Sequence, residues 1–419
     1  MATPRILNRH ALATTPARSD ALDILEAGLA AVDTDTIIRS SAHVDGDMLH
    51  IRDFAFDLHD FRNIHVIGFG KASCPAAEAL ADILGDRAVR GVALGAEAKV
   101  CRTIDVCEAS HPLPSARNFE LSERLVRECE AVSEDDLVFV MVSGGGSAML
   151  CWPQSECDQA GRLYAASLRA GLSIHELNTV RKHLSALKGG GLAKLLSPAT
   201  VIGLIFSDVP GGSPEIVASG PTFPDSSTLA DAQAIIDRFH LGEFELTETP
   251  KDLDLFRNVT NIVMVSNQNA LDAMASVASS LGYTAVIAGA DRYESPDVLI
   301  PALQQHSIPK SAVIAGGEPT LRVPMNSGIG GRNQHTALVA AGLLLSGQVF
   351  ASLASDGHDN GQHAGAMVDP GTPARADGMD FQARIARFDD TAILERTGDH
   401  IETGQTGANV SDLMLLLQE

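Results

Sequence analysis

The sequence predicts an α/β protein built on largely parallel sheets, and two observations support this fold class. Short continuous apolar runs recur along the chain, and each ends in glycine or a small polar residue. Alanine- and leucine-rich stretches with helical spacing, such as residues 76–84 and 270–281, lie between several of these runs. Continuous apolar strands that alternate with helices are typical of parallel sheets covered on both faces. The predicted strands are residues 64–69, 137–142, 201–206, 261–265, 312–315 and 349–354.

Two further features indicate how this fold is divided along the chain. Residues 20–40 carry apolar side chains mostly on one helical face, which predicts a helix before the first strand. Residues 241–258 are rich in Glu, Asp and Thr and interrupt the strand–helix pattern. We therefore predict one domain over residues 1–245 and a second over 246–419, with the tail at 403–417 closing back onto either domain.

The composition is that of a folded, soluble protein. The 419 residues are 45% hydrophobic and 20% charged, which suits two or three domains and excludes a disordered chain. A formal net charge of −22 argues against nucleic acid as a partner, because phosphate backbones would be repelled. The sequence shows no apolar run of membrane-spanning length, and residues 1–18 lack the apolar core of a signal peptide. We expect a cytoplasmic protein without a membrane partner.

The spacing of cysteine and histidine argues against a disulfide framework and against a zinc site. Six cysteines are scattered along the sequence without a C-x-x-C pair, which predicts reduced thiols. His111, His183 and His358 do not have the helical spacing of zinc-protease ligands.

The first polar strand end is Gly68-Phe69-Gly70-Lys71-Ala72-Ser73, which precedes a helix with Pro75 in its first turn. We expect Ser73 to cap that helix and Lys71 to hold a phosphate at the helix start. The nucleotide P-loop pattern is absent, and Ser73 stands where the dinucleotide fingerprint has its third glycine. The alternative is a surface lysine beside a tight turn.

A second strand-to-helix turn is Ser143-Gly144-Gly145-Gly146-Ser147. Three successive glycines expose backbone amides, which suits a phosphate or a carboxylate. Ser147 is placed to cap the next helix or to contact a ligand hydroxyl. A nucleophilic serine is excluded, because no G-x-S-x-G pattern is present.

Residues 178–191 concentrate basic groups in an otherwise acidic protein. Arg181, Lys182 and Lys188 fall partly on one helical face, and the glycines at 189–191 mark the end of that helix. We expect this segment, which begins at Asn178, to contact substrate or phosphate. The alternative is a solvated helix face.

The richest glycine segment combines Gly316-Gly317-Glu318-Pro319-Thr320 with Gly328-Ile329-Gly330-Gly331-Arg332-Asn333-Gln334. A strand precedes it, and a helix-patterned run at residues 336–345 follows it. A helix start offers unpaired amides and partial positive charge, so an anion is the natural occupant. Arg332 adds a rigid fork of donors for phosphate or carboxylate. The alternative is a loop that needs glycine only for its turns.

Two aspartates, Asp208 and Asp356, each follow an apolar strand. Phosphoryl transfer needs a divalent ion on the phosphates and often a carboxylate that orients the attacking hydroxyl. One of these aspartates holding magnesium and another accepting a proton would meet that need. The alternative is that each aspartate only hydrogen-bonds its own turn.

Together these segments resemble the glycerate 2-kinase family, two-domain proteins once labelled hydroxypyruvate reductases. The resemblance covers most of the chain, from about Gly68 to Leu413, and GGRNQ followed by SDGHD is its most specific part. The matching stretches are GFGKAS, HPLPSARN, SGGGSAML, HELNTVRKHLSALKGGGLA, SDVPGGSPEIVASGPTFPD, GGEPTLRV, GIGGRNQHTAL, SDGHDN and TGANVSDL.

The resemblance implies a larger Rossmann-like three-layer α/β/α domain with a parallel sheet and a smaller C-terminal α/β domain of the MOFRL type with a mixed sheet. It places the active site in the cleft between them. It also implies transfer of the ATP γ-phosphoryl group to the 2-hydroxyl of D-glycerate with Mg²⁺. Catalytic importance attaches to Lys71 and Arg332, and we add Asp208 as a catalytic carboxylate and metal ligand beside Asp356. The residues expected to bind substrate or phosphate are Ser143, Gly144, Gly145, Gly146, Ser147, Asn178, Arg181, Lys182, Lys188, Gly317, Glu318, Gly330, Gly331 and Asn333.

Three positions depart from the usual family pattern. Gly212 replaces a carboxylate in the loop after Asp208, Pro319 replaces a threonine, and Asn360 replaces a glycine. The first change puts the anionic ligand set in doubt, and with it the choice of hydroxyacid. Kinase action on another small sugar acid, NAD(P)H-dependent reduction of hydroxypyruvate, and ligand sensing without chemistry are the competing functions. The oligomeric state stays open, with a homodimer among the options.

Overall fold

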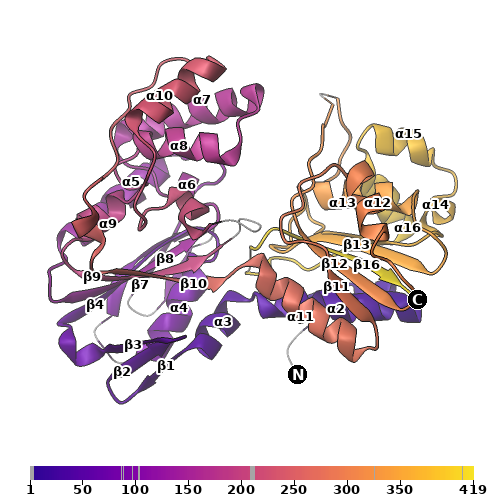
Figure 1. Cartoon of the computed structure of the whole chain (residues 1–419), viewed down its shortest axis with the longest axis horizontal. Helices are drawn as coiled ribbons and strands as arrows, with labels where there is room; N and C mark the ends of the chain where they lie inside the picture. Colours follow the sequence, from indigo (N-terminus) through magenta and orange to yellow (C-terminus); the bar gives the residue numbers. More distant parts are fainter. Residues whose placement is uncertain are drawn as a thin grey trace. The chain divides into compact units, whose positions relative to one another are not determined.

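The computed structural model describes residues 4–85, 87, 89–96, 98–101, 104–207, 213–324, 326–407 and 409–419. It divides into two compact units (Figure 1). The first unit is Thr34–Met264, and the second combines Met1–Asp33 with Val265–Glu419. Two α/β units are confirmed, but the division lies at residue 264 and not at 245. The reason is that the strand after the acidic segment completes the first sheet.

The first unit has a seven-stranded sheet with the order β10-β9-β8-β4-β5-β7-β6. Strands β9, β8, β4, β5 and β7 pair in parallel, while β6 is antiparallel to β7. The bounds are β4 (Asn63–Phe69), β5 (Val89–Gly95), β6 (Lys99–Cys101), β7 (Ile104–Glu108), β8 (Asp136–Ser143), β9 (Thr200–Phe206) and β10 (Val259–Val265). A separate antiparallel sheet contains β1 (Ala42–Asp45), β2 (Met48–Ile51) and β3 (Phe54–Asp57).

Helices cover both faces of this sheet, as Figure 1 shows. Helix α4 packs against β4 and β5 on one face, with α3 behind it, and α5 packs on the other face together with α9. The bounds are η1 (Leu58–Asp60), α3 (Thr34–Ser41), α4 (Ser73–Leu84), α5 (Ala116–Glu130), α6 (Gly146–Met149), α7 (Gln154–Ala170), α8 (Ile174–Leu184), α9 (Gly191–Leu196), η2 (Pro214–Ser219), α10 (Leu229–Phe239) and η3 (Leu253–Phe256).

The second unit has a mixed sheet with the order β11-β12-β16-β13-β14-β15. Only β11 and β12 pair in parallel, and each later pair is antiparallel. The bounds are β11 (Thr284–Ile287), β12 (Ser311–Gly317), β13 (Gln348–Ala354), β14 (Gly365–Val368), β15 (His400–Ile401) and β16 (Asp412–Gln418). The C-terminal tail thus supplies β16, which lies inside this sheet and is paired along both of its edges.

Helices again cover both faces of the second sheet (Figure 1). Helices α2 and α11 pack together on one face, and α13 packs against β13 and β14 on the other with α12 and α16 beside it. The bounds are α1 (Arg9–Leu12), α2 (Pro16–Ala31), α11 (Asn267–Ser280), α12 (Pro296–Gln304), α13 (Arg332–Ala341), α14 (Thr372–Arg375), α15 (Phe381–Ala386) and α16 (Asp390–Thr397). The N-terminal α2 therefore belongs to the second unit, which the sequence did not indicate.

All six predicted apolar runs are strands, but several helix bounds differ from the prediction. The single helix expected at residues 20–40 is two helices, α2 and α3, which fall in different units. The basic helix α8 ends at Leu184, before the glycines, and Gly190 instead precedes α9 as its N-cap.

The cysteine prediction is wrong for one pair, because Cys151 and Cys157 form a disulfide. Their Cα atoms are 5.7 Å apart, since Cys151 closely follows a short helix and Cys157 lies in the first turn of the next one. Cys107 and Cys129 are free thiols, as expected.

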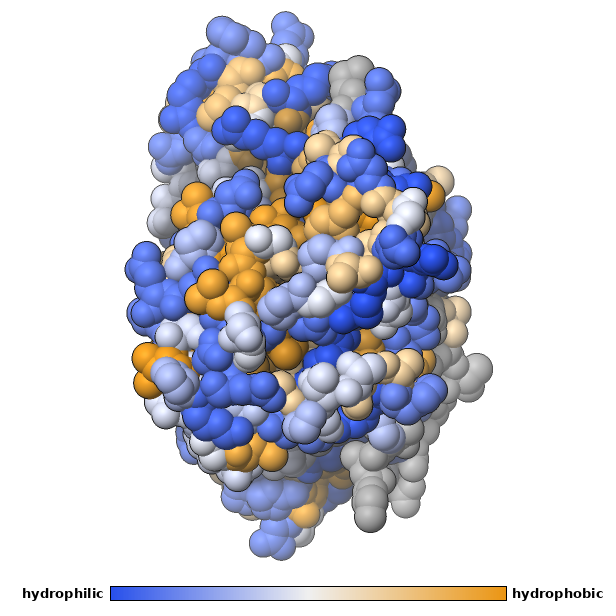
Figure 2. Space-filling view, turned by 90° about the vertical axis from the view of Figure 1, so that its right-hand side faces the viewer, coloured by the Kyte–Doolittle hydropathy of each residue, from blue (hydrophilic) through white to orange (hydrophobic). Residues whose placement is uncertain are grey.

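The surface agrees with the charged composition. The face drawn in Figure 2 is mainly hydrophilic, and hydrophobic side chains gather on it in small patches. In the described part of the chain, each helix is too short or too polar to cross a bilayer.

Arg18 anchors α2 to the second unit through buried ion pairs. It is 2% exposed, pairs with Asp369 and Asp399, and donates to the Leu12 carbonyl at 2.9 Å. Arg375 also pairs with Asp369 and Asp399, so removing Arg18 leaves both carboxylates with one of two cationic partners. We therefore expect the lower end of the about 3–5 kcal/mol that breaking a buried ion pair typically costs.

We expect Arg18→Ala to lower the free energy of unfolding of the second unit by about 3 kcal/mol, measured by urea denaturation. Arg9→Ala is the matched control in the same unit, because Arg9 pairs at 2.9 Å with the exposed Asp23, and such pairs contribute at most about 1 kcal/mol. Equal effects of the two substitutions would contradict this assignment.

Candidate active site

The polar strand ends of the first unit lie side by side, as the parallel pattern predicted. The register aligns Phe69 with Val142 and Ser143 with Phe206, so β4, β8 and β9 end at the same edge. The backbone amide of Lys71 donates to the Gly144 carbonyl at 2.9 Å. The two predicted phosphate turns are therefore one contiguous loop cluster, with the half-buried Lys71 at its centre.

Within this cluster, Ser143 holds the neighbouring turn in shape. Its buried hydroxyl accepts a hydrogen bond from the Ala72 amide at 3.0 Å. Gly70 has φ of +114°, and a Cβ there would lie 2.3 Å from the Ser143 Oγ. Ser73 is not the N-cap that we predicted, because its hydroxyl donates to the Gly70 and Leu94 carbonyls at 2.7 and 2.9 Å. Ala72 occupies the cap position instead.

A hydrogen-bonded chain of side chains connects three of the predicted residues. Ser147 lies 2.9 Å from Ser219, whose hydroxyl donates to Asn178 Oδ1 at 3.0 Å. Arg181 approaches the same oxygen at 3.5 Å. Since the Ser219 proton points to Asn178, Ser147 is the donor in the serine pair.

Ser219 is the residue that the sequence interpretation missed. It is fully buried, and both Ala218 and Ser219 adopt positive φ, at +49° and +63°. Non-glycine residues in this region carry strain that surrounding contacts must stabilise, and such strain is concentrated at functional sites. The signal in the sequence was the segment itself, VASGP, which matched the family without showing which residue mattered.

Arg181 is half-buried and forms no ion pair among the described residues. Burial lowers the pKa of Arg181, although Glu156 and Tyr164 oppose the shift. Its guanidinium makes no ion pair within the described residues, and it lines a small cavity of about 20 Å³ with Ser147 and Pro112. A partly buried guanidinium that forms no ion pair is well suited to bind an anionic ligand group.

The other two basic residues of this segment have partners inside the protein. Lys188 is fully buried, pairs with Glu156 and donates to the Leu150 carbonyl at 2.7 Å. Burial lowers the pKa of Lys188, and Glu156 opposes this shift. Lys182 pairs with buried Asp225 at 3.2 Å. Their placement favours support of the fold over the ligand contact that we predicted.

In the second unit, α13 begins at Arg332 as predicted, but a carboxylate of the chain already occupies the helix start. Asp359 accepts hydrogen bonds from the Asn333 and Gln334 amides at 3.0 and 2.8 Å. It is 4% exposed, and burial raises its pKa while these hydrogen bonds oppose the shift. The anion that the glycine-rich pattern indicated is therefore an internal one.

Neighbouring predicted residues support this arrangement. Asn333 is buried and accepts from the Ser352 hydroxyl at 2.5 Å. A Cβ on Gly331 would lie 2.1 Å from the Asp359 carbonyl oxygen, so glycine is required for this close approach. Gly317 similarly faces the backbone of Arg292, where an added Cβ would lie 2.2 Å from the carbonyl oxygen. Asn333, Gly331 and Gly317 therefore support the backbone around the site.

Arg332 points away from the helix start and is fixed by two carboxylates. Its Nε donates to Asp412 at 2.7 Å, and one terminal nitrogen donates to Glu318 at 3.0 Å. Asp412 is 2% exposed and Glu318 is 41% exposed. Burial disfavours the charged guanidinium, but the two carboxylates outweigh this effect and raise the pKa of Arg332.

Arg332 and Glu318 line a cavity of about 490 Å³ in the second unit. Gly330, Gly331, Glu318 and Arg332 form its polar wall, as the glycine-rich segment predicted. Phe388, which also lines the cavity, stacks on His335 with ring centroids 3.9 Å apart, and His335 Nδ1 lies 3.1 Å from a carboxylate oxygen of Asp390. The apolar part of the lining consists of Pro319, Leu321, Val323, Tyr293 and Phe388. This volume lies within the range of small-molecule sites.

Of the two predicted metal ligands, the structure describes Asp356 but not Asp208. Asp208 and the departure at Gly212 lie outside the described residues. Asp356 follows β13 and accepts a hydrogen bond from the His358 amide at 3.0 Å, which is the local turn contact of the alternative interpretation. Asn360 adopts φ of +55°, a conformation that asparagine tolerates in place of glycine, and donates to the Gly330 carbonyl at 2.9 Å.

The burial of Asp412 predicts a pH dependence of stability. Burial raises the pKa of Asp412 from 3.8 to about 7, although Arg332 opposes the shift. The folded protein then binds this proton more tightly than the unfolded chain does. The stability contributed by Asp412 is therefore present at low pH and is lost as the pH rises from 3.8 to about 7.

We expect the variant Asp412→Asn to lack this decline. Urea unfolding of both proteins across that pH range measures the effect, and the stability of the variant relative to the natural chain should increase with pH. Parallel curves for the two proteins would show that Asp412 does not titrate there.

Known proteins are similar to this chain in both sequence and architecture. Residues 20–254 match the family model described as a domain of unknown function, DUF4147, and residues 311–412 match the MOFRL family. The D-glycerate 2-kinase of Thermotoga maritima is 33% identical over 376 residues, which cover 84% of this chain and 89% of the relative. A putative hydroxypyruvate reductase of Agrobacterium vitis is 35% identical over 378 residues, which cover 84% and 98%.

The crystal structure of glycerate kinase from Thermotoga maritima is similar as a whole. It matches with a TM-score of 0.82 at 30% identity, covering 96% of this chain and 99% of that one. Sequence and structure agree over both units, and the chain belongs to the glycerate kinase family.

Proposed function

We propose that this protein is a glycerate 2-kinase that transfers the γ-phosphoryl group of ATP to the 2-hydroxyl of D-glycerate with the help of Mg²⁺. The observation that carries the proposal is Arg332, which projects into a cavity of about 490 Å³ and is fixed there by Asp412. Membership of the glycerate kinase family gives the class of reaction. A cytoplasmic location and a homodimer are part of this proposal and stay predictions.

The cavity around Arg332 has the features of a nucleotide site. Its aromatic and apolar wall, with Tyr293 and Phe388, offers surfaces on which a base can stack. Arg332 on the polar wall offers donors to the phosphates. Glu318 is the more exposed of its two partners, so a phosphate can replace Glu318 while buried Asp412 keeps the guanidinium in place.

Two further groups are assigned to the phosphates. Lys71 and the glycine turn at Gly144 form one loop cluster at the edge of the first sheet, where parallel sheets bind their ligands. In our proposal Lys71 is a second cation on the transferring group. Positive charge that is already fixed in place is the main source of rate enhancement in phosphoryl transfer.

The residues present are compatible with Mg²⁺. This ion prefers oxygen ligands and usually binds one or two carboxylates together with substrate phosphates. Asp356 offers a half-buried carboxylate at the end of β13. A carboxylate has about four lone-pair sites, so the hydrogen bond that it accepts from the His358 amide is compatible with a metal ion as well. Asp356 and Asp208 would hold the ion, which supplies neutralising charge on the phosphates.

Arg181 is assigned to the carboxylate of the hydroxyacid. It is half-buried, lacks an ion pair within the described residues, and is oriented by Asn178, Ser219 and Ser147. Binding the carboxylate would fix the neighbouring 2-hydroxyl. The oxygen of that hydroxyl then attacks the γ-phosphorus, the bond to the ADP oxygen breaks, and a carboxylate, for which we propose Asp208, accepts the hydroxyl proton.

The direct test is a coupled assay of ADP release with D-glycerate and other small hydroxyacids, with and without magnesium. We expect magnesium-dependent turnover with D-glycerate as the preferred substrate. Phosphorus NMR of the product distinguishes the 2-phosphate from other regioisomers. Tight binding of D-glycerate without ADP release would favour a sensor.

Reduction of hydroxypyruvate is the second candidate, because a relative from Agrobacterium vitis carries that name. The site offers little for a dinucleotide, since Ser73 is buried at the position of the third fingerprint glycine and bonds two carbonyls. Following NADH and NADPH absorbance with hydroxypyruvate should show no oxidation.

Replacing Arg332 should affect the chemical step. We expect Arg332→Ala to lower kcat by about 10³-fold, the lower end of the effect of a phosphoryl-stabilising arginine, and Arg332→Lys to recover only part of it. Arg396→Ala is the control, because Arg396 is an exposed arginine on α16 of the same unit. Full activity of Arg332→Ala would remove this residue from the mechanism.

Replacing Arg181 should instead affect binding of the acid. We expect Arg181→Ala to raise the KM for D-glycerate about 10- to 100-fold, as for loss of a charge-assisted contact, with the KM for ATP unchanged. Arg169→Ala, at an exposed position of α7, is the matched control. An equal change in both KM values would mean that Arg181 supports the fold and does not select the substrate.

A further inference from the structure

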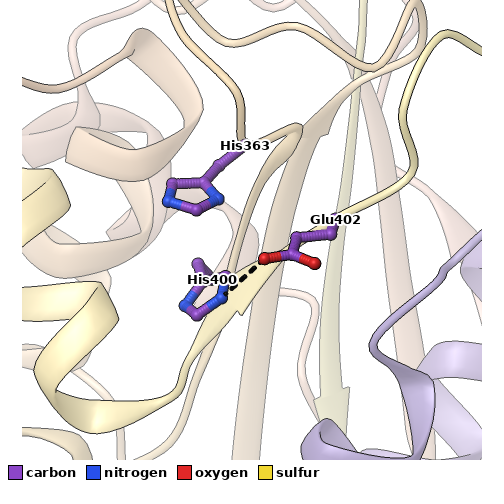
Figure 3. A group of neighbouring side chains, drawn as sticks. All are labelled: His363, His400 and Glu402. Atoms are coloured by element: carbon purple, nitrogen blue, oxygen red, sulfur yellow. Dashed lines mark hydrogen bonds and ion pairs between the residues drawn. The ribbon is translucent and has the colours of Figure 1, made fainter.

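A cluster of two histidines and a glutamate lies in the second unit, apart from the residues assigned to the kinase reaction. Figure 3 shows His363, His400 and Glu402 facing one another. Strand pairing brings them together, because β14 and β15 align Ala366 with His400 and the Ala364 amide donates to the Ile401 carbonyl at 2.8 Å. One potential ligand atom from each side chain lies within 4.8 Å of the other two.

The outer ring nitrogen of each histidine is already bonded to an acceptor. His363 Nε2 lies 3.3 Å from a carboxylate oxygen of Glu395, and His400 Nδ1 lies 3.3 Å from the Leu394 carbonyl. Because a carboxylate can only accept, His363 Nε2 carries the proton in the neutral ring and His363 Nδ1 presents a lone pair. His400 faces an acceptor at both nitrogens, the Leu394 carbonyl at Nδ1 and Glu402 at Nε2, so its neutral ring supplies a proton to only one of them.

The inner atoms of the cluster have fewer protons than acceptors. His400 Nε2 is 3.1 Å from a carboxylate oxygen of Glu402, so a neutral His400 that donates to Leu394 has no proton left for Glu402. His363 Nδ1 is buried and has no hydrogen-bond partner among the described residues. The side chain of His363 is 11% exposed, so water does not readily satisfy this atom. A cation between the two imidazoles and the carboxylate would satisfy these atoms together.

We propose that His363, His400 and Glu402 bind one divalent transition metal of the Zn²⁺ type. Imidazole nitrogen with one carboxylate is a preferred ligand set for zinc and is unlike the all-oxygen set of magnesium. Ligands about 2.0–2.1 Å from a tetrahedral zinc are roughly 3.3 Å apart, close to the contact between His400 and Glu402. Glu395 and the Leu394 carbonyl are the outer partners that orient metal-binding histidines.

Glu402 gives the ion a route from solvent, because its side chain is 44% exposed. The same strand end binds the N-terminal segment, since Asn8 donates to the His400 carbonyl at 2.7 Å and accepts from the Glu402 amide at 3.0 Å. A bound metal would therefore stabilise the junction between Asn8 and β15. This proposal does not depend on the kinase function.

Calorimetric titration of chelator-treated full-length protein with Zn²⁺ at about pH 7.5 tests the proposal, and Co²⁺ provides a second probe through its visible absorption. We expect one ion per chain, because the three side chains form one site. His400→Ala and Glu402→Gln should each weaken binding by at least about 100-fold, and Glu395→Gln by about 10- to 100-fold through ligand orientation.

The control is His43→Ala, because His43 and His50 form another histidine pair with ring centroids 4.9 Å apart. Binding that is unchanged in that variant and lost in the first two supports the site. Circular dichroism and magnesium-dependent kinase activity of Glu402→Gln should match those of the natural chain. Absence of stoichiometric binding, or equal affinity of His400→Ala and the natural chain, would overturn the proposal.

Discussion

The ion pair between Arg332 and Asp412 is the constraint on which the second unit's site depends. It joins the first residue of α13 to the first residue of β16, a strand paired on both sides within the sheet. The Asp412 side chain is 2% exposed, so ions from the solvent do not compete with it for the guanidinium. Glu318 completes the pair from the cavity wall, and its exposure makes it the partner that a ligand can replace. Asp412 therefore keeps the Arg332 guanidinium in a fixed position, and displacement of Glu318 makes its positive charge available to a ligand.

The presence or absence of a carboxylate partner also distinguishes the basic residues of the first unit. Lys188 and Lys182 have buried carboxylate partners, so their charges are used to stabilise the fold. Arg181 has an amide oxygen at 3.5 Å as its neighbour and no ion pair among the described residues. A group that is positioned but not neutralised is the better candidate for binding an anionic substrate.

The sequence predicted the fold well because buried parallel strands have a simple pattern. All six continuous apolar runs are strands, and the turns at Lys71 and Gly144 meet as their positions at adjacent strand ends required. The second sheet was predicted as mixed only through the family resemblance. Periodicity does not reveal that the C-terminal strand β16 lies between β12 and β13, because that pairing depends on contacts between distant segments.

The candidate site was predictable in its residues but less so in their roles. The glycine-rich segment was expected to bind a ligand anion at a helix start, and Asp359 occupies that position instead. Sequence spacing could not show this, since Asp359 follows a different strand and reaches α13 only in the folded unit. The N-terminal helix α2 was assigned to the wrong unit for a related reason, because an amphipathic pattern shows that a face is buried without showing against what. Ser219 and the cluster around His363 also became visible only through contacts between separate segments.

A crystal structure with a non-hydrolysable ATP analogue, Mg²⁺ and D-glycerate tests the central claim most directly. We expect the γ-phosphate to lie within hydrogen-bond distance of the Arg332 guanidinium. Glu318 should be displaced, and Asp412 should still accept a hydrogen bond from Arg332 Nε. Phosphates bound elsewhere, with Arg332 still paired to both carboxylates, would contradict it.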